Sequence, residues 1–280
     1  MGFEVIHSPY KPIWVPVDTP AGAATTLYVG QLVVAGVNAS CQGVKAWNVA
    51  GIYDTTADQI PFGVVIGTNN RTPTFNSTYK TDSITSAYTV AGQLARDWVG
   101  TEGMHKKTDP AAMVQVAVLT PETVLKGPIF NGATYGTAIT EAVVTAVNAT
   151  MGLGFTCGTT GFDFTSVAYN ATMYCRSGAN KGLYRATYSA AAGTAEHLFY
   201  TYWPYTIAVG DKFVGANLPV CGTGTINFDD TGQYINGAAA VTTTDYIGIN
   251  ILRLDLERTG AEYAIFTINP HMFLQGATRT

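Results

Sequence analysis

The chain has 280 residues and a mass of 29.7 kDa, enough for one large domain or two domains of about 100–150 residues. Hydrophobic residues make up 47% and charged residues 12%, about half the roughly 25% charge of ordinary soluble domains. Such a chain can bury enough surface to offset its ordering entropy, which excludes a disordered protein. The net charge is −4 and the basic residues do not cluster, so we expect no nucleic-acid partner. Because no long apolar run lacks glycine, threonine or charge, we expect no membrane partner either.

Prolines dominate the first twenty residues. Each fixes its own φ and moves the preceding residue out of the helical region. We therefore expect residues 1–20 to form an extended arm, with an edge strand that covers its own domain as the alternative; a central strand is excluded. Aromatic residues in desolvated pockets carry much of the energy of protein interfaces. The predicted protein-interface residues are Pro9, Tyr10, Pro12, Ile13 and Trp14.

The rest of the first half consists of short β-rich runs punctuated by glycine. Expected strands cover residues 27–35, 44–49, 62–66, 87–94 and 113–119. No convincing helix of three turns is present. Around residues 120–131 two prolines and a glycine surround a short apolar run, which indicates a strand-like crossing between domains. We place a domain boundary near residue 130, with an N-terminal β domain over 21–130 and a C-terminal β domain over 131–280.

The second half is again rich in β-forming residues. Expected strands cover residues 141–147, 165–176, 182–188, 198–202, 213–217, 246–256 and 262–268. In the run 246–256 the apolar alternation slips by one position at Ile251–Leu252, which predicts a bulge or bend. Many short strands with frequent turn signals predict an all-β protein with two small barrel-like or sandwich-like domains.

The sharpest string of catalytic type is Asp230-Thr231-Gly232. Aspartic proteases pair two such triplets to activate water, but this chain has one. Asp and Gly also suit a tight turn, so we interpret the triplet as a hairpin turn between residues 224–228 and 233–235. Residues 178–182, Gly-Ala-Asn-Lys-Gly, lack the ending of a phosphate loop and are likewise interpreted as a hairpin connection.

No histidine is spaced as a metal ligand, and no serine lies in a hydrolase elbow. The four cysteines form no C-x-x-C pair and are interpreted as buried small hydrophobes. We therefore expect no enzyme activity, no metal and no cofactor.

One aromatic cluster is conspicuous: Phe199, Tyr200, Tyr202, Trp203 and Tyr205. Strand alternation places about half of such residues in the core. The remainder suit a protein interface, since tyrosine is favoured there. Stacking on sugar rings stays open as an alternative.

Several strings, read in order, resemble the capsid decoration (cement or auxiliary head) proteins of tailed bacteriophages. They are LYVGQLVV (27–34), PFGVVIG (61–67), VQVAVL (114–119), PETVLKGPIFN (121–131), RSGANKGLYR (176–185) and WPYTIAVGDKF (203–213). The resemblance implies a non-enzymatic virion protein on the outer capsid surface, commonly a homotrimer, that clamps neighbouring major capsid protein subunits. It carries no catalytic residues over. A host-attachment or glycan-binding β protein of a virion or cell surface is the alternative.

Overall fold

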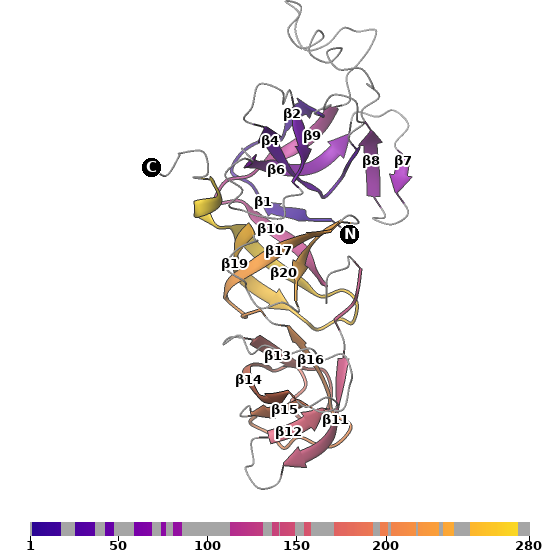
Figure 1. Cartoon of the computed structure of the whole chain (residues 1–280), viewed down its shortest axis with the longest axis vertical. Helices are drawn as coiled ribbons and strands as arrows, with labels where there is room; N and C mark the ends of the chain where they lie inside the picture. Colours follow the sequence, from indigo (N-terminus) through magenta and orange to yellow (C-terminus); the bar gives the residue numbers. More distant parts are fainter. Residues whose placement is uncertain are drawn as a thin grey trace, which may run out of the picture. The chain divides into compact units, whose positions relative to one another are not determined.

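The computed structural model describes residues 2–17, 26–36, 43–47, 59–68, 74–76, 81–85, 113–130, 136–139, 141–148, 154–157, 171–192, 197–200, 203–216, 218–229, 232–237 and 247–273. In these ranges the chain forms β-strands and a single short 3-10 helix, η1 (Pro270–Phe273) (Figure 1). The all-β fold class expected from the short, turn-punctuated runs is confirmed.

Two compact units divide the chain. Unit 1 comprises Met1–Lys126 and Thr267–Thr280, and unit 2 comprises Gly127–Phe266. The sequence indicated a boundary near residue 130 and assigned all of 131–280 to one domain. In the structure the division follows Lys126, and the C-terminal segment belongs to unit 1, where η1 contacts one of its strands. Such a return depends on contacts between distant residues, which local turn signals do not reveal.

The main sheet of unit 1 is antiparallel, with the strand order β2-β9-β6-β4-β5. Its strands are β2 (Ile13–Pro16), β4 (Leu32–Gly36), β5 (Val44–Ala46), β6 (Gln59–Thr68) and β9 (Met113–Val118). A β-bridge between Val17 and Val44 joins the chain just after β2 to β5, so the two outer strands approach each other. A smaller sheet has the order β3-β8-β7, formed by β3 (Thr26–Tyr28), β7 (Thr74–Asn76) and β8 (Thr81–Thr85).

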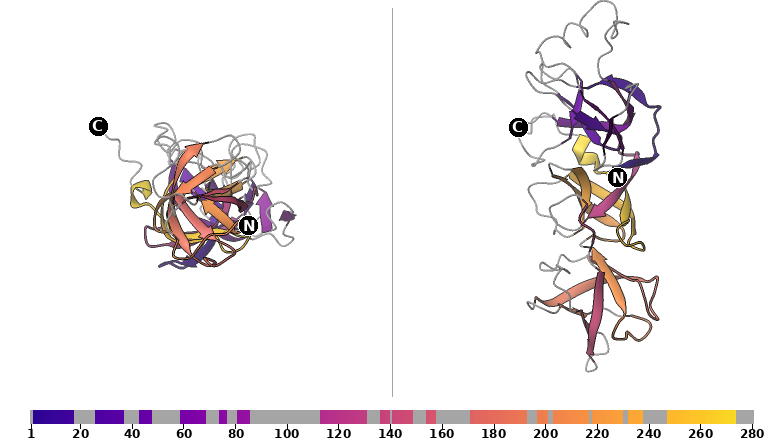
Figure 2. Two further views of the ribbon diagram at one scale, coloured as in Figure 1. Left: turned by 90° about the horizontal axis from the view of Figure 1, so that it is seen from below. Right: turned by 90° about the vertical axis from the view of Figure 1, so that its right-hand side faces the viewer.

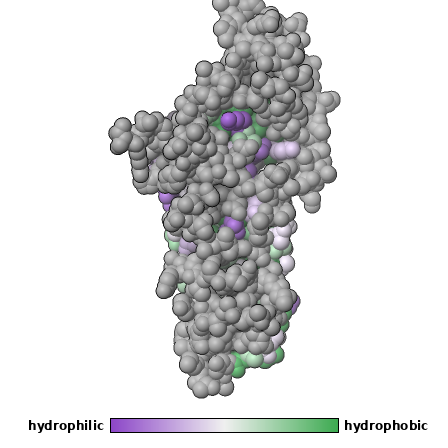
Figure 3. Space-filling view, viewed as in Figure 1, coloured by the Kyte–Doolittle hydropathy of each residue, from purple (hydrophilic) through white to green (hydrophobic). Residues whose placement is uncertain are grey.

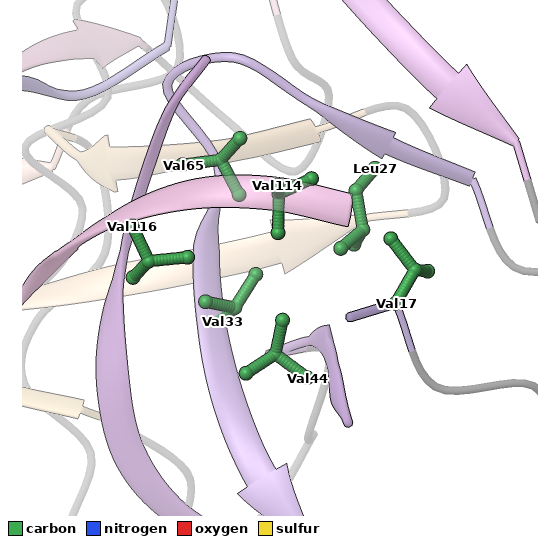
Figure 4. Close-up of a cluster of buried hydrophobic side chains, with 7 residues drawn as sticks. All are labelled: Val17, Leu27, Val33, Val44, Val65, Val114 and Val116. Carbon is green, nitrogen blue, oxygen red and sulfur yellow. The ribbon is translucent and has the colours of Figure 1, made fainter. Parts of the chain in front are cut away.

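Valines fill the core of unit 1. Figure 4 shows seven buried side chains that point toward one another: Val17, Leu27, Val33, Val44, Val65, Val114 and Val116. Their β-branched shape suits the pleated surface of a strand. Removing each such side chain from water contributes about 1.5–3 kcal/mol, so this cluster is the main stabilising feature of the sheet.

Residues 27–35, expected to be one strand, form two. β3 ends at Tyr28 and β4 begins at Leu32, with a turn between them in which Gly30 has a φ of 87°. The backbone N–H of Gln31 donates to the carbonyl of Tyr28 across this turn, at 3.1 Å. Side chains other than glycine rarely adopt a positive φ, so Gly30 permits the break.

Unit 2 contains a closed barrel with the strand order β11-β12-β15-β14-β13-β16, in which β16 pairs back with β11. Its strands are β11 (Glu141–Asn148), β12 (Gly154–Cys157), β13 (Ala171–Cys175), β14 (Tyr184–Ala192), β15 (His197–Tyr200) and β16 (Lys212–Ala216). The strands wrap around a shared interior (Figure 2). Its buried cluster consists of Ala142, Val144, Met173, Cys175, Trp203 and Phe213.

A second sheet has the order β1-β10-β18-β17-β19-β20, and β10 also pairs with β20. Its strands are β1 (Glu4–His7), β10 (Val124–Phe130), β17 (Gly222–Asp229), β18 (Gly232–Asn236), β19 (Ile247–Asp255) and β20 (Tyr263–Ile268). The first residues of β10 pair with β1 in unit 1, and its last residues pair with β18 in unit 2. The crossing expected around residues 120–131 is therefore a strand.

In the run 246–256 burial changes phase after Ile251, but β19 continues to Asp255 and its register with β17 is regular, so the expected bulge or bend is not seen in that pairing. Ile249 and Ile251 are buried, Leu252 is half exposed, and burial resumes at Leu254. The pairing of β19 with β17 ends at Ile251, so the alternation changes where the ladder ends.

Most of the other expected strands are present with shifted ends. The strand expected at 87–94 and the first part of that expected at 165–176 lie outside the described residues. The sequence did not indicate β1, β7, β8 or β12, which are short and have little apolar alternation.

Candidate functional site

The N-terminal segment presents exposed apolar side chains. Tyr10 is 61%, Ile13 43% and Trp14 47% exposed, and Pro9 and Pro12 are exposed as well. Ser8 orders the stretch before β2, because its Oγ donates to the carbonyl of Tyr10 at 3.2 Å. Large apolar groups concentrated in one short, ordered segment are typical of an interaction surface.

The register of β2 shows which of its side chains face the core. Ile13 lies opposite Val116 and Val15 opposite Val114, and both partners are fully buried. Directly opposite residues of an antiparallel pair lie on the same face, so Ile13 and Val15 lie on the core-facing side of the sheet. Trp14 pairs with Gln115 on the other face. The indole is therefore outside the core of its own unit.

The edge-strand alternative for residues 1–20 is the one that the described residues support, and a freely extended arm is not what they form. Phe3 is buried, and its N–H donates to the carbonyl of Gly30 at 2.7 Å. Further along, β1 pairs with β10, β2 pairs with β9, and Val17 is fully buried. Both ends of the segment are therefore anchored, because Phe3 and Val17 are buried. Residues 18–20 lie outside the described residues.

Charge contributes little to this surface. Glu4 pairs with Lys126 at 3.4 Å, and both side chains are exposed, so the pair contributes at most about 1 kcal/mol. Between Ser8 and Pro16 the one charged residue is Lys11. Contacts made here would therefore be mainly apolar.

A second exposed feature lies in the barrel, on the loop that follows β15. Tyr205 is 61% exposed, but its backbone is held firmly. The buried side chain of Asn180 donates through Nδ2 to the carbonyl of Tyr205 at 2.8 Å, and its Oδ1 accepts from the N–H of Tyr205 at 3.1 Å. These two bonds hold the backbone of Tyr205, so the loop presents an exposed phenol ring from an ordered backbone.

The side chain of Asp211 forms a further hydrogen bond to the same loop. Its Oδ2 accepts from the N–H of Ala208 at 2.9 Å, and the carboxylate lies against Gly178. Gly178 has a φ of 76°, and a Cβ there would collide with the Asp211 carboxylate. Hence the hairpin expected at residues 178–182 is confirmed between β13 and β14, with glycine required at its first position. Asn180 lies within this hairpin, and its side chain forms the two hydrogen bonds to Tyr205.

The aromatic cluster divides between core and surface. Trp203 is buried against Phe213, with ring centroids 5.1 Å apart, and the Arg185 guanidinium lies over its ring at 5.8 Å. Tyr205 is the exposed member. The side chains of Phe199 and Tyr200, and the whole of Tyr202, lie outside what the structure describes. Figure 3 also shows hydrophobic residues on the surface where Figure 1 labels β11, a strand in which Val143 and Val147 are exposed.

The hairpin interpretation of Asp230-Thr231-Gly232 agrees with the structure. β17 and β18 pair antiparallel, and Asp229 lies opposite Gly232, as a hairpin between these strands requires. Asp230 itself lies outside the described residues. Within those residues no group of three or more His, Cys, Asp or Glu side chains is arranged to hold a metal ion.

The structure describes the side chains of two cysteines, Cys175 and Cys221, and both are free. Cys175 is buried, and burial raises the pKa of its thiol to about 11, which is the state of an unreactive core residue. Cys221 is exposed, so for this residue the expectation of a buried small hydrophobe is wrong. Its position in the turn before β17 leaves no core for it to enter.

Comparisons of the chain with protein-family models, with curated proteins and with solved structures find no match. In the described part of the chain, the helical residues lack the length and hydropathy needed to cross a membrane.

Proposed function

We propose that this chain is a non-enzymatic structural protein of a bacteriophage particle, which binds the outer capsid surface and stabilises contacts between major capsid protein subunits. The observation that carries the proposal is the N-terminal surface formed by Pro9, Tyr10, Pro12, Ile13 and Trp14. These side chains are exposed, sit on a fastened segment and include almost no charge. The ordered resemblance to capsid decoration proteins supplies the partner.

Preorganisation favours this surface as an interface. Pro9 and Pro12 restrict the backbone before binding, so less conformational entropy is lost on docking. Trp14 faces away from its own core, which leaves its ring free to fill a pocket on a partner, where aromatic anchors contribute most. A homotrimer that presents three such surfaces would strengthen attachment through multivalency.

The first test is the copy number of this chain in purified virus particles, measured by quantitative gel staining. A decoration protein coats the head, so its copies should be comparable in number to those of the major capsid protein. A few copies per particle would overturn the proposal and favour a host-attachment protein at a single site.

The second test separates binding from folding. Trp14→Thr removes the exposed indole from the outer face of β2 and keeps a residue suited to strands. Cosedimentation with capsids that lack the protein should fall at least about tenfold in affinity, in the range of an interface hot spot. The urea midpoint should change little. Leu27→Ala, in the core, is the matched control: it should cost about 2–5 kcal/mol of folding stability. Undiminished capsid binding by Trp14→Thr would refute the assigned surface.

A glycan-binding function is the second candidate, and Tyr205 is the observation that favours it. An exposed phenol ring on a backbone that is held in place is suited to stacking on a sugar face. If this alternative holds, the wild type should be retained on a glycan array and Tyr205→Ala should not be. If the chain is instead a decoration protein, Tyr205→Ala should cosediment with capsids as the wild type does.

A further inference from the structure

The barrel of unit 2 is an insertion in the second sheet. Its strands β11 to β16 are consecutive in the chain and lie between β10 and β17, which both belong to that sheet. Two covalent connections therefore join barrel and sheet, one before β11 and one after β16. A third, noncovalent connection comes from Arg176, which follows β13 directly.

The guanidinium of Arg176 binds the turn between β19 and β20. Its Nε and Nη2 both donate to the carbonyl of Leu256, at 3.1 and 2.7 Å. Nη1 donates to Oγ1 of Thr259 at 2.9 Å, and Nη2 donates to Oε1 of Glu262 at 2.6 Å. The side chain is 6% exposed, so these bonds form away from water, where they are strongest.

The barrel also binds the other backbone group of Leu256. Its N–H donates to the hydroxyl of Tyr184, on β14, at 3.0 Å. Both main-chain polar groups of Leu256 are thus satisfied by barrel side chains. At the far end of the turn, Glu262 accepts through its carbonyl from the N–H of Ile129 in β10, at 2.9 Å. Glu262 consequently connects Arg176 to the sheet itself.

The charges in this cluster balance. Arg176 pairs with Glu262 and, at 3.5 Å, with Glu141, which in turn pairs with Lys212 at 2.8 Å. Two cations and two anions sum to zero. Lys212 and Glu141 reach solvent, whereas Arg176 and Glu262 are buried, so removing Arg176 leaves the Glu262 carboxylate without its cation and destabilises the turn that it supports.

We propose that Arg176 is a latch that holds the β19–β20 turn on the barrel, and that releasing it lets the turn detach and open locally while both barrel and sheet stay folded. The apolar core of the barrel lies in a separate cluster that does not include Arg176. The guanidinium interacts with backbone and carboxylate groups instead, so its loss removes the connection without opening a cavity in that core.

Trypsin cleavage after Arg258 is a local probe of the latch in the full-length chain. Arg258 is exposed and lies in the turn, between the Leu256 and Thr259 contacts. Cleavage of a folded protein follows the population of the locally open form when reclosing is fast. In Arg176→Gln the rate of cleavage at this site should rise at least about tenfold, because even one lost charge-assisted hydrogen bond has an effect of that size.

Two references make the result specific. Lys181 is exposed in the β13–β14 hairpin, and its cleavage rate should not change, since that hairpin does not depend on the latch. Arg253→Gln removes an ion pair between exposed Arg253 and buried Asp255 on β19. It leaves the bond from the Glu257 N–H to Asp255 in place and should leave cleavage at Arg258 as in the wild type. Arg176→Lys keeps the charge but not the forked contacts, and should give an intermediate rate. An unchanged rate at Arg258 in Arg176→Gln would overturn the proposal.

Tyr184→Phe keeps the test decisive if Arg176→Gln does not fold. It removes only the hydroxyl that accepts from Leu256, so hydrogen exchange of the Leu256 amide should accelerate at least about tenfold, while amides of β13 keep their protection. Equal acceleration throughout the barrel would show that these residues maintain the whole fold, and the latch would be withdrawn. An unchanged Leu256 amide would overturn it as well.

Discussion

Gly178 shows how a single residue limits the shape of the exposed loop in the barrel. It combines a φ of 76° with a close approach to the Asp211 carboxylate. Gly182, at the other end of the hairpin, has a φ of 90° but open space where a Cβ would stand. Comparing substitutions at the two glycines therefore distinguishes the cost of a positive φ from the cost of a steric collision.

We predict that Gly178→Ala is the more costly of two otherwise similar substitutions. Gly182→Ala should lose about 1–2 kcal/mol of folding stability, the cost of placing alanine in the left-handed region. Gly178→Ala should lose more than that, because Asp211 must also move and release the N–H of Ala208. Urea unfolding of the two variants measures the difference. Equal losses would show that the carboxylate adapts without cost.

The buried thiol of Cys175 and the buried phenol of Tyr184 predict a loss of folding stability at alkaline pH. Burial raises the pKa of Tyr184 to about 12 from 10.0, and that of Cys175 to about 11 from 9.0. The folded state therefore keeps these protons at pH values where the unfolded chain has lost them. Their contribution to stability is complete below pH 9.0 and declines as the pH rises through about 11 and 12.

Urea unfolding at a series of pH values tests this prediction. The free energy of unfolding should start to fall above the ordinary thiol pKa of 9.0. In Cys175→Ala the fall should begin later, near the ordinary phenol pKa of 10.0, because the tyrosines are then the first such groups to titrate. The same onset in both proteins would contradict the assignment to Cys175.

At the scale of elements, β2 pairs with β9 alone among the described strands, and Val17 directly after it bridges to Val44 of β5. Pro16 ends β2 and Pro12 directly precedes it, and neither residue has a backbone N–H to offer at an open edge. Such an edge resists the addition of another strand, and this leaves side chains as the means of contact.

Restoring the donors should therefore promote self-association. The double variant Pro12→Thr and Pro16→Thr supplies two N–H groups and two residues that favour strands. Sedimentation velocity should show larger or concentration-dependent species than the wild type forms. Pro9→Thr, which lies before the strand, is the control and should sediment as the wild type does. An unchanged distribution for the double variant would show that another feature protects this edge.

Residues 2–16 cannot be deleted as a neutral test of an arm. The deletion would remove buried Phe3, and with it the whole of β1 and β2, from unit 1. Loss of capsid binding in that truncation would then report unfolding as well as a missing interface. Substitution of Trp14 separates the two, since its side chain lies on the outer face.

For the whole molecule, the low charge density predicts how the protein leaves a capsid. At about 1 M NaCl the Debye length is about 3 Å, so interactions between exposed charges are screened. The proposed surface is apolar apart from Lys11, and its binding should withstand this salt. Urea or detergent should release the protein before the shell fails. Particles washed under each condition and analysed by gel provide the measurement, and ready release by salt would contradict an apolar interface.

Much of the fold could be predicted from local residue patterns. Proline positions excluded a central strand near the N-terminus, because a missing N–H acts at the residue itself. The change of phase in the apolar residues at Ile251–Leu252 could be recognised in the sequence because strand alternation has a period of two. Asp230-Thr231-Gly232 indicated a hairpin because its residue types suit a tight turn.

Contacts between residues that are distant in the sequence could be identified only from the tertiary structure. Asn180 grips Tyr205, Arg176 reaches Leu256 and Glu262, and the C-terminal segment returns to unit 1. No local spacing encodes these pairs, since one side chain can satisfy any polar group that folding brings near it. The sequence by itself thus determined which residues form strands and turns, through sterics and hydrogen-bond donors. Only the packing of those strands decided which residues are buried together, and so which of Trp14, Tyr205 and Trp203 face water.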